Sequence, residues 1–199
     1  MASLIEAARD PGFPARIVLV LSNRPDAAGL SVARAAGIPA AVLDHGPYRG
    51  DRAAHEAAID EALRGAGAAF VCLAGYMRRL TPLLVGRWAG RMLNIHPSLL
   101  PAFPGLHTHA RALAAGVKLH GCTVHLVTET VDAGPILAQA AVPVLPGDTE
   151  ETLAARVLAC EHILYPAALA NVAGGTGAAA LQPPAAALFN PLPLRPATT

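Results

Sequence analysis

The stretch Met92-Leu93-Asn94-Ile95-His96-Pro97-Ser98-Leu99-Leu100-Pro101 determines both the fold and the candidate site. Residues 92–96 are predicted to form a buried strand, which Pro97 ends because proline cannot donate to a strand ladder. Residues i and i+2 of a strand point to the same face, so Asn94 and His96 should project together while Ile95 turns into the core. Open α/β sheets carry their chemistry at the carboxyl ends of such strands. We therefore expect a functional site where this strand ends.

Apolar runs alternate with helical patterns on both sides of this strand. Further strands are predicted over residues 15–21, 40–43, 70–74, 122–128 and 135–144, the last two antiparallel. Helices are predicted over residues 1–9, 25–36, 51–64, 81–88, 107–115 and 148–173. In the last helix Asp148 should be the N-cap, with Glu151 placed for a capping box. This alternation predicts an α/β domain over residues 1–173 with a mostly parallel sheet. Residues 174–199, rich in Pro, Ala and Gly, are predicted to be a disordered tail.

Composition narrows the class of protein. The chain has 199 residues, 53% of them hydrophobic, which suits one globular domain. Its 15 basic and 14 acidic residues give a net charge of +1 and no electrostatic argument for nucleic acid or membrane binding. No continuous apolar run reaches the ~18 residues that span a bilayer. Cys72, Cys122 and Cys160 lie far apart in apolar contexts, so free thiols of a reducing cytoplasm are expected. The chain could be a monomer or a homodimer.

A carboxylate completes a candidate chemical set. Asp132 lies downstream in the turn-like stretch 131–135, and an amide, an imidazole and a carboxylate form a plausible acyl-transfer set. Taken alone, Asp-Ala-Gly-Pro is an ordinary turn and His96 could be a hydrogen-bonded core histidine.

The remaining histidines do not suggest a metal site. His107 and His109 would diverge on a helix, and His120 and His125 should fall on opposite faces of a strand. No acidic or thiol residue has ligand spacing to them, so no metal is expected.

Five segments carry a resemblance that covers residues 1–172: VLSNRPDAAGLSVARAAGIP (20–39), VCLAGYMRRLTPLLV (71–85), GRMLNIHPSLLPAFPGLHTHARAL (90–113), HGCTVHLVTETVDAGPILAQAAVPV (120–144) and the set Glu161, His162, Tyr165 and Pro166. Together they resemble the phosphoribosylglycinamide formyltransferases, also called glycinamide ribonucleotide transformylases, which are folate-dependent enzymes of purine synthesis. The loop after His96 resembles that of the glycinamide ribonucleotide enzymes and not that of the related formyltetrahydrofolate deformylases or methionyl-tRNA formyltransferases. It implies a formyltransferase-type, Rossmann-like three-layer fold.

The resemblance implies a reaction in which a formyl group passes from 10-formyltetrahydrofolate to the amine of glycinamide ribonucleotide. The Asn94 amide and a protonated His96 would stabilise the charge that develops on the formyl oxygen. His96 would also supply the proton that the departing folate nitrogen needs. Asp132 would favour the imidazolium form of His96 and order a water that relays protons.

The resemblance also implies two binding regions, beside which no metal is expected. The residues that the resemblance implies contact the folate co-substrate are Arg52, Met77, Arg78, Arg79, Leu80, Asn94, Thr128, Glu129, Thr130, Val131 and Asp132. Arg79 stands where the family more often has an aliphatic residue. The residues that the resemblance implies lie near the ribonucleotide are Pro97, His107 and Glu161.

Two features of the family are expected to be missing. Its members begin with a strand and a Gly-x-Gly-Ser-Asn loop that cradles the substrate phosphate. Met1 aligns just after that loop, so the neighbours of the absent internal strand should lack ladder partners on one side, and the ribonucleotide should bind weakly. One hypothesis is an enzyme whose true start lies upstream, so that the sequence is N-terminally truncated. The alternative is a non-catalytic folate-binding remnant or pseudoenzyme.

Overall fold

The computed structural model describes residues 1–174 and 188–190. The helices are α1 (Ala2–Ala7), α2 (Ala28–Ala35), α3 (Arg52–Gly65), α4 (Pro82–Arg87), α5 (Thr108–Ala114) and α6 (Glu150–Val172), with a 3-10 turn η1 (Gly46–Tyr48). The strands are β1 (Val20–Ser22), β2 (Ala40–Val42), β3 (Val71–Leu73), β4 (Met92–His96), β5 (Leu119–Leu126), β6 (Ile136–Pro143) and β7 (Leu188–Asn190). The predicted α/β fold is confirmed, and the fourth predicted strand, residues 92–96, has the predicted bounds.

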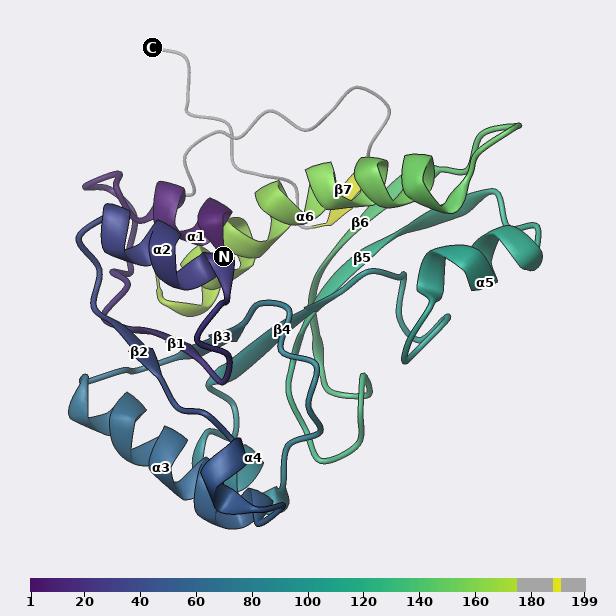
Figure 1. Ribbon diagram of the computed structural model, residues 1–199. Helices are drawn as coiled ribbons and strands as arrows, with labels where there is room; N and C mark the ends of the chain where they lie inside the picture. The colour runs from purple at the N-terminus through teal and green to yellow at the C-terminus, as the bar shows by residue number, and fades with distance from the viewer. Residues whose placement is uncertain (175–187, 191–199) are drawn as a thin grey trace.

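The strands form a layer between two groups of helices (Figure 1). Helices α1, α2 and α6 lie on one side of the strands, and α3 and α4 lie on the other. Adjacent residues of β4 show why both sides are filled, because Leu93 is in the core that α6 covers and Met92 packs with Ile59 and Trp88 of the opposite core. A strand that is apolar on both faces therefore carries the candidate site.

Pairing places β4 beside two different strands. β3 and β4 are parallel, with Leu73 beside Asn94. β4 and β5 are antiparallel, with Asn94 opposite His125. β5 and β6 form the predicted antiparallel pair around the turn that contains Asp132. β5 ends beside the start of β4, where the Val127 N–H donates to the Met92 carbonyl, and the connection to β6 folds back so that Asp132 reaches His96 and His125.

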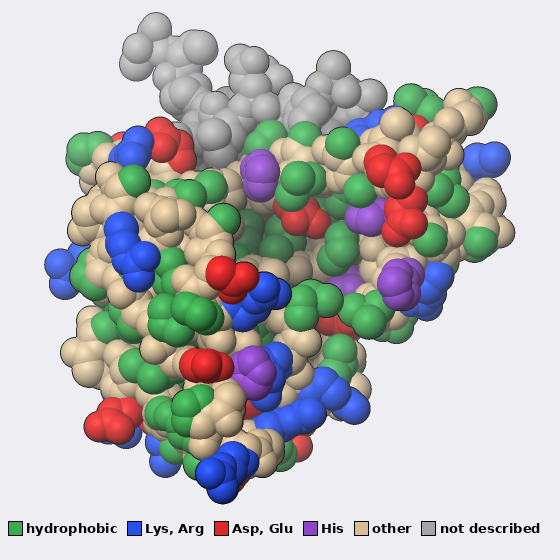
Figure 2. All heavy atoms as spheres, in the orientation of Figure 1, with side chains coloured by type: hydrophobic (Ala, Val, Ile, Leu, Met, Phe, Trp, Pro, Cys, Tyr) green, Lys and Arg blue, Asp and Glu red, His purple; other side chains and the backbone are tan. Residues whose placement is uncertain are grey.

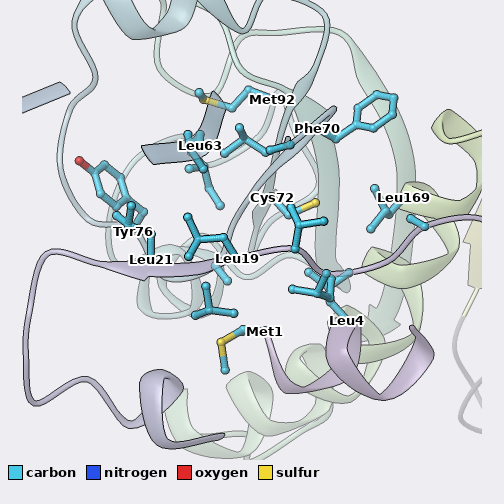
Figure 3. Close-up of a pocket in the computed structure, with 18 of the residues that line it drawn as sticks. Met1, Leu4, Leu19, Leu21, Leu63, Phe70, Cys72, Tyr76, Met92 and Leu169 are labelled. Carbon is cyan, nitrogen blue, oxygen red and sulfur yellow. The ribbon is translucent and has the colours of Figure 1, made fainter. Parts of the chain in front are cut away.

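A cavity of about 570 Å³ separates the sheet that contains β1 and β2 from the sheet that contains β3 to β7 (Figure 3). Residues that line it include Met1, Leu4, Leu21 and Cys72. On the edges that face away from the cavity, the Val20 N–H donates to the carbonyl of Pro39, just before β2, and the Val71 N–H donates to the carbonyl of Arg91, just before β4. Peptide groups alternate in direction along a strand, so those of Leu21 and Cys72 point toward the cavity. Among residues 1–174 and 188–190, no strand pairs with β1 or β3 on the edge that faces the cavity.

The cavity also explains why β1 is shorter than predicted. Residues 15–21 were predicted to be a strand, but the paired segment is Val20–Ser22. Residues 15–19 line the cavity, and among residues 1–174 and 188–190 no strand pairs with that segment. Apolar sequence alone does not make a strand without a neighbour to bond.

Hydrogen exchange tests this cavity directly. In β1 the amide of Leu21 should exchange at least about 10-fold faster than that of Val20, and in β3 the amide of Cys72 should exceed that of Val71 by the same factor. The reason is that Val20 and Val71 donate to the neighbouring chain segment, whereas the amides of Leu21 and Cys72 point toward the cavity. Exchange followed by NMR at residue resolution provides the measurement. Equal protection of both members of each pair would contradict the unpaired edges.

Three local predictions need correction. The N-cap of α6 is Thr149, not Asp148, and its capping box uses Thr152 instead of Glu151. The reason is that Asp148 pairs with Arg156, with 2.7 Å between the Arg156 Nη1 and the Asp148 Oδ2. β5 starts at Leu119, earlier than predicted, because its first residues pair with the end of β6.

The predicted disordered tail contains a strand. Leu188–Asn190 forms β7 and pairs antiparallel with β6. The rest of the tail after Gly174 lies outside the described residues. Separately, α6 is long and apolar enough to cross a membrane by length and composition, although 56% of its most apolar window is buried. Its contacts with β5 and β6 identify it as a core helix of this fold.

Candidate functional site

Four side chains meet where β4 ends. The His96 Nδ1 lies 3.5 Å from the Asp132 Oδ2. The Asn94 Nδ2 lies 3.3 Å from the His125 Nε2, which in turn lies 3.8 Å from the Asp132 Oδ1. Asn94, His96 and Asp132 were singled out from the sequence, and the structure brings these three together. We call Asn94, His96, His125 and Asp132 the polar cluster.

Asp132 is held in place by the backbone around it. Its φ is 54°, in the left-handed region where Asp is tolerated better than most residues. The Gly105 N–H donates to its Oδ2 at 2.8 Å, and its side chain is only 9% exposed. Two residues later, a Cβ at Gly134 would lie 1.8 Å from the carbonyl oxygen of Leu126. The carboxylate is therefore fixed by a turn that only glycine can complete.

His96 is buried between two acceptors. Its Nε2 lies 3.1 Å from the carbonyl oxygen of Phe103, and its Nδ1 faces Asp132. Only the doubly protonated imidazolium can donate to both. The imidazole is thus held between the loop that follows β4 and the β5–β6 turn.

The loop after His96 is anchored to the sheet. The Thr123 hydroxyl donates to the Ser98 carbonyl at 2.7 Å and accepts from the Leu100 N–H at 3.0 Å. The Gln139 amide donates to the Leu100 carbonyl at 2.9 Å. Because Thr123 and Gln139 belong to β5 and β6, regular strands position the loop that contacts His96.

His125 belongs to the cluster, although the sequence analysis gave it no role beyond excluding it from a metal site. The register of β5 against β4 is continuous through His125, and the shift between Val124 and His125 lies in the pairing of β5 with β6. The pairing of His125 opposite Asn94 brings the two side chains together. A cross-strand register of this kind has no signal in a single sequence. His120 lies elsewhere, against the His109 and Phe103 rings, and burial lowers its pKa to about 4.

The candidate folate residues lie mostly on the surface. Met77 is 76% exposed, whereas Leu80 packs on the core beside α3 and α4. Exposed positions are also occupied by Arg52, Arg79, Thr128, Glu129, Thr130 and Val131. Arg78 is half-buried beside Tyr76, whose pKa is raised chiefly by burial. Exposed side chains of this kind are free to contact a ligand, but the structure does not join them to the polar cluster.

The candidate ribonucleotide residues lie at separate points. Pro97 directly follows β4, and His107 is exposed at the start of α5 with a φ of 56°. Glu161 lies on α6, where burial raises its pKa to about 7 against the opposing effect of the Met1 ammonium. Figure 2 shows the viewed face hollowed, with hydrophobic, acidic and histidine side chains around the hollow. Within residues 1–174 and 188–190, no group of three or more His, Cys, Asp or Glu side chains could hold a metal ion.

Comparison with known proteins extends across most of the chain. The family model for formyl transferases matches residues 1–169. The chain is 51% identical to the trifunctional purine biosynthetic protein adenosine-3 of Bos taurus, covering 88% of the chain but only 17% of that protein. It is 42% identical to the phosphoribosylglycinamide formyltransferase of Escherichia coli, covering 88% of the chain and 82% of that enzyme.

A solved structure agrees with these relatives. The crystal structure of phosphoribosylglycinamide formyltransferase from Brucella melitensis has 59% sequence identity and a TM-score of 0.84, covering 90% of the chain and 92% of that structure. Sequence and fold therefore agree, and the chain belongs to the formyl transferase family.

Proposed function

We propose that the chain transfers a formyl group from 10-formyltetrahydrofolate to the amine of glycinamide ribonucleotide, in purine biosynthesis. The observation that carries the proposal is the convergence of Asn94, His96 and Asp132 at the end of β4. The names of the relatives support the choice of substrates. These relatives are named as enzymes, which does not favour the alternative of a non-catalytic remnant.

The geometry suggests how the cluster would act. The amine attacks the formyl carbon, and the formyl oxygen gains negative charge as the new carbon–nitrogen bond forms. The Asn94 N–H and the His96 imidazolium are the donors for that charge. When the bond to the folate nitrogen breaks, His96 gives that nitrogen a proton, and the proton lost by the amine leaves through a water beside Asp132. The products are the formylated ribonucleotide and tetrahydrofolate.

We assign the binding regions on the same basis. The folate would bind the exposed side chains of residues 77–80 and 128–131 together with Arg52, and the ribonucleotide would bind near Pro97, His107 and Glu161. No metal is assigned a role. The free thiols of Cys72, Cys122 and Cys160 support a reducing cytoplasm as the place of the reaction.

A transfer assay with one variant tests the proposal. The chain is mixed with both substrates at saturating concentration, and the turnover rate is measured from the formylated ribonucleotide detected by mass spectrometry. Asn94→Ala should lower turnover by about 100-fold or more, because one donor to the developing charge is lost. Asn171→Ala, an exposed position on α6, should leave turnover unchanged. A folded wild-type chain that forms no product would refute the proposed function.

Glu161 gives a prediction that does not depend on activity. Burial raises its pKa from 4.5 to about 7, so the folded chain holds a proton that the unfolded chain releases. The resulting stability is fully present below about pH 4.5 and is lost as pH rises through about 7. Glu161→Gln should remove this loss, which we expect to be about 2 kcal/mol.

Urea unfolding at a series of pH values measures this effect. The wild-type chain should lose stability between about pH 4 and 8 relative to Glu161→Gln, whereas the exposed Glu61→Gln should follow the wild type. Parallel curves for Glu161→Gln and the wild type would contradict a buried, protonated carboxyl.

A further inference from the structure

The protonation of His125 can be read from its two contacts. Its Nδ1 lies 3.0 Å from the carbonyl oxygen of Leu126, which can only accept, so the Nδ1 carries a hydrogen. Its Nε2 lies 3.3 Å from the Asn94 side-chain amide. If the ring is neutral, the Nε2 has no hydrogen and must accept.

Two ionisable neighbours shift the pKa of His125 in opposite directions. Asp132 on the β5–β6 turn favours a charged His125, while His96 on β4 opposes it. Burial is the largest effect and lowers the pKa of His125, whose side chain is only 3% exposed. The Asp132 Oδ1 lies 3.8 Å from the His125 Nε2, too far for a hydrogen bond that would hold a proton on that nitrogen. His125 is therefore a neutral imidazole, with its hydrogen on Nδ1.

A neutral His125 constrains the Asn94 amide. An Nε2 acceptor bonds the NH₂ end of the amide and repels its oxygen, so one of the two rotations of the amide is selected. One hydrogen of the NH₂ group is bound to His125, and the second remains free to donate. Without this acceptor the amide could turn over and present its oxygen, which repels a developing negative charge.

We infer that His125 is a positioning residue that locks the Asn94 amide with its NH₂ group toward the reacting formyl oxygen. The inference rests on the proposed function, in which Asn94 donates to that oxygen. His125 does not touch the substrate; it acts through Asn94. The continuous antiparallel register of β4 and β5, which sets His125 directly opposite Asn94, aims the ring at this amide.

Two amide substitutions of His125 separate this role from packing. Glutamine can place an oxygen acceptor near the Nε2 position, whereas asparagine reaches only the Nδ1 position beside the Leu126 carbonyl. His125→Asn should lower kcat by about 10- to 100-fold, with the KM for 10-formyltetrahydrofolate changed by less than about 3-fold. His125→Gln should recover kcat to within about 5-fold of the wild type.

NMR of the Asn94 side-chain amide supplies a readout without turnover. In the wild type and His125→Gln its two hydrogens should give distinct, slowly exchanging signals, and in His125→Asn the signals should broaden or move toward free amide values. Equal losses of kcat in both variants, or no loss in His125→Asn, would overturn the inference. A wild-type chain without turnover would refute the proposed function instead, and the NMR arm would still decide whether His125 holds the amide.

Discussion

Asp132→Asn should lower kcat by about 1,000-fold while changing the affinity for 10-formyltetrahydrofolate by less than about 3-fold. The substitution keeps the size of the side chain, and asparagine also tolerates the left-handed backbone at this position, where φ is 54°. What it removes is the negative charge that faces the His96 Nδ1 at 3.5 Å and the His125 Nε2 at 3.8 Å. The pH dependence of turnover should change as well, because His96 loses its carboxylate.

The measurement is steady-state kinetics across pH, with folate affinity determined by fluorescence or calorimetry. Asp26→Asn is the matched control, because Asp26 is exposed and paired with Arg24 away from the cluster. The control should retain wild-type turnover. Unchanged kcat in Asp132→Asn would eliminate the carboxylate from the mechanism, and a proportional loss of folate affinity would make it a binding residue.

Gly134→Ala should disable the site from within the turn. The added Cβ would lie 1.8 Å from the Leu126 carbonyl oxygen and 3.1 Å from the Thr128 Cγ2, and the first of these is backbone that cannot move aside alone. The turn that carries Asp132 must therefore shift. We expect a loss of about 3 kcal/mol in the free energy of unfolding and a fall of at least about 100-fold in turnover.

Denaturant unfolding and the transfer assay together test this prediction. Gly86→Ala in α4 is the control, because nothing lies within 4 Å of its added Cβ and alanine favours a helix by about 1 kcal/mol over glycine. That variant should be as stable as the wild type or more so, with unchanged turnover. Wild-type stability and turnover in Gly134→Ala would show that the turn adapts, contrary to the close approach seen at Leu126.

The elements that the sequence predicted well are those with local signals. Residues 92–96 form a strand as predicted, since an apolar run ended by a proline contains the necessary information. The same-face rule for i and i+2 correctly grouped Asn94 with His96. Asp132 joined them only through the resemblance, because a turn sequence by itself says nothing about what the turn faces.

The elements that were missed depend on partners far along the chain. The short β1 follows from its second edge, along which no strand lies in the described part of the chain. The shifted cap of α6 follows from the ion pair between Asp148 and Arg156. His125 was given no catalytic role because its place opposite Asn94 depends on how β4 and β5 pair, which the sequence does not show. Each error arises where tertiary pairing overrides a local pattern.

The central claim is that the cluster at the end of β4 moves a formyl group between two bound substrates. The most direct measurement follows carbon-13-labelled formyl by NMR in a mixture of the chain, labelled 10-formyltetrahydrofolate and saturating glycinamide ribonucleotide. The label should move to the ribonucleotide amine, and His96→Ala should slow that movement by about 1,000-fold or more. A label that stays on the folate while both substrates are bound, or that moves equally fast in His96→Ala, would contradict the claim.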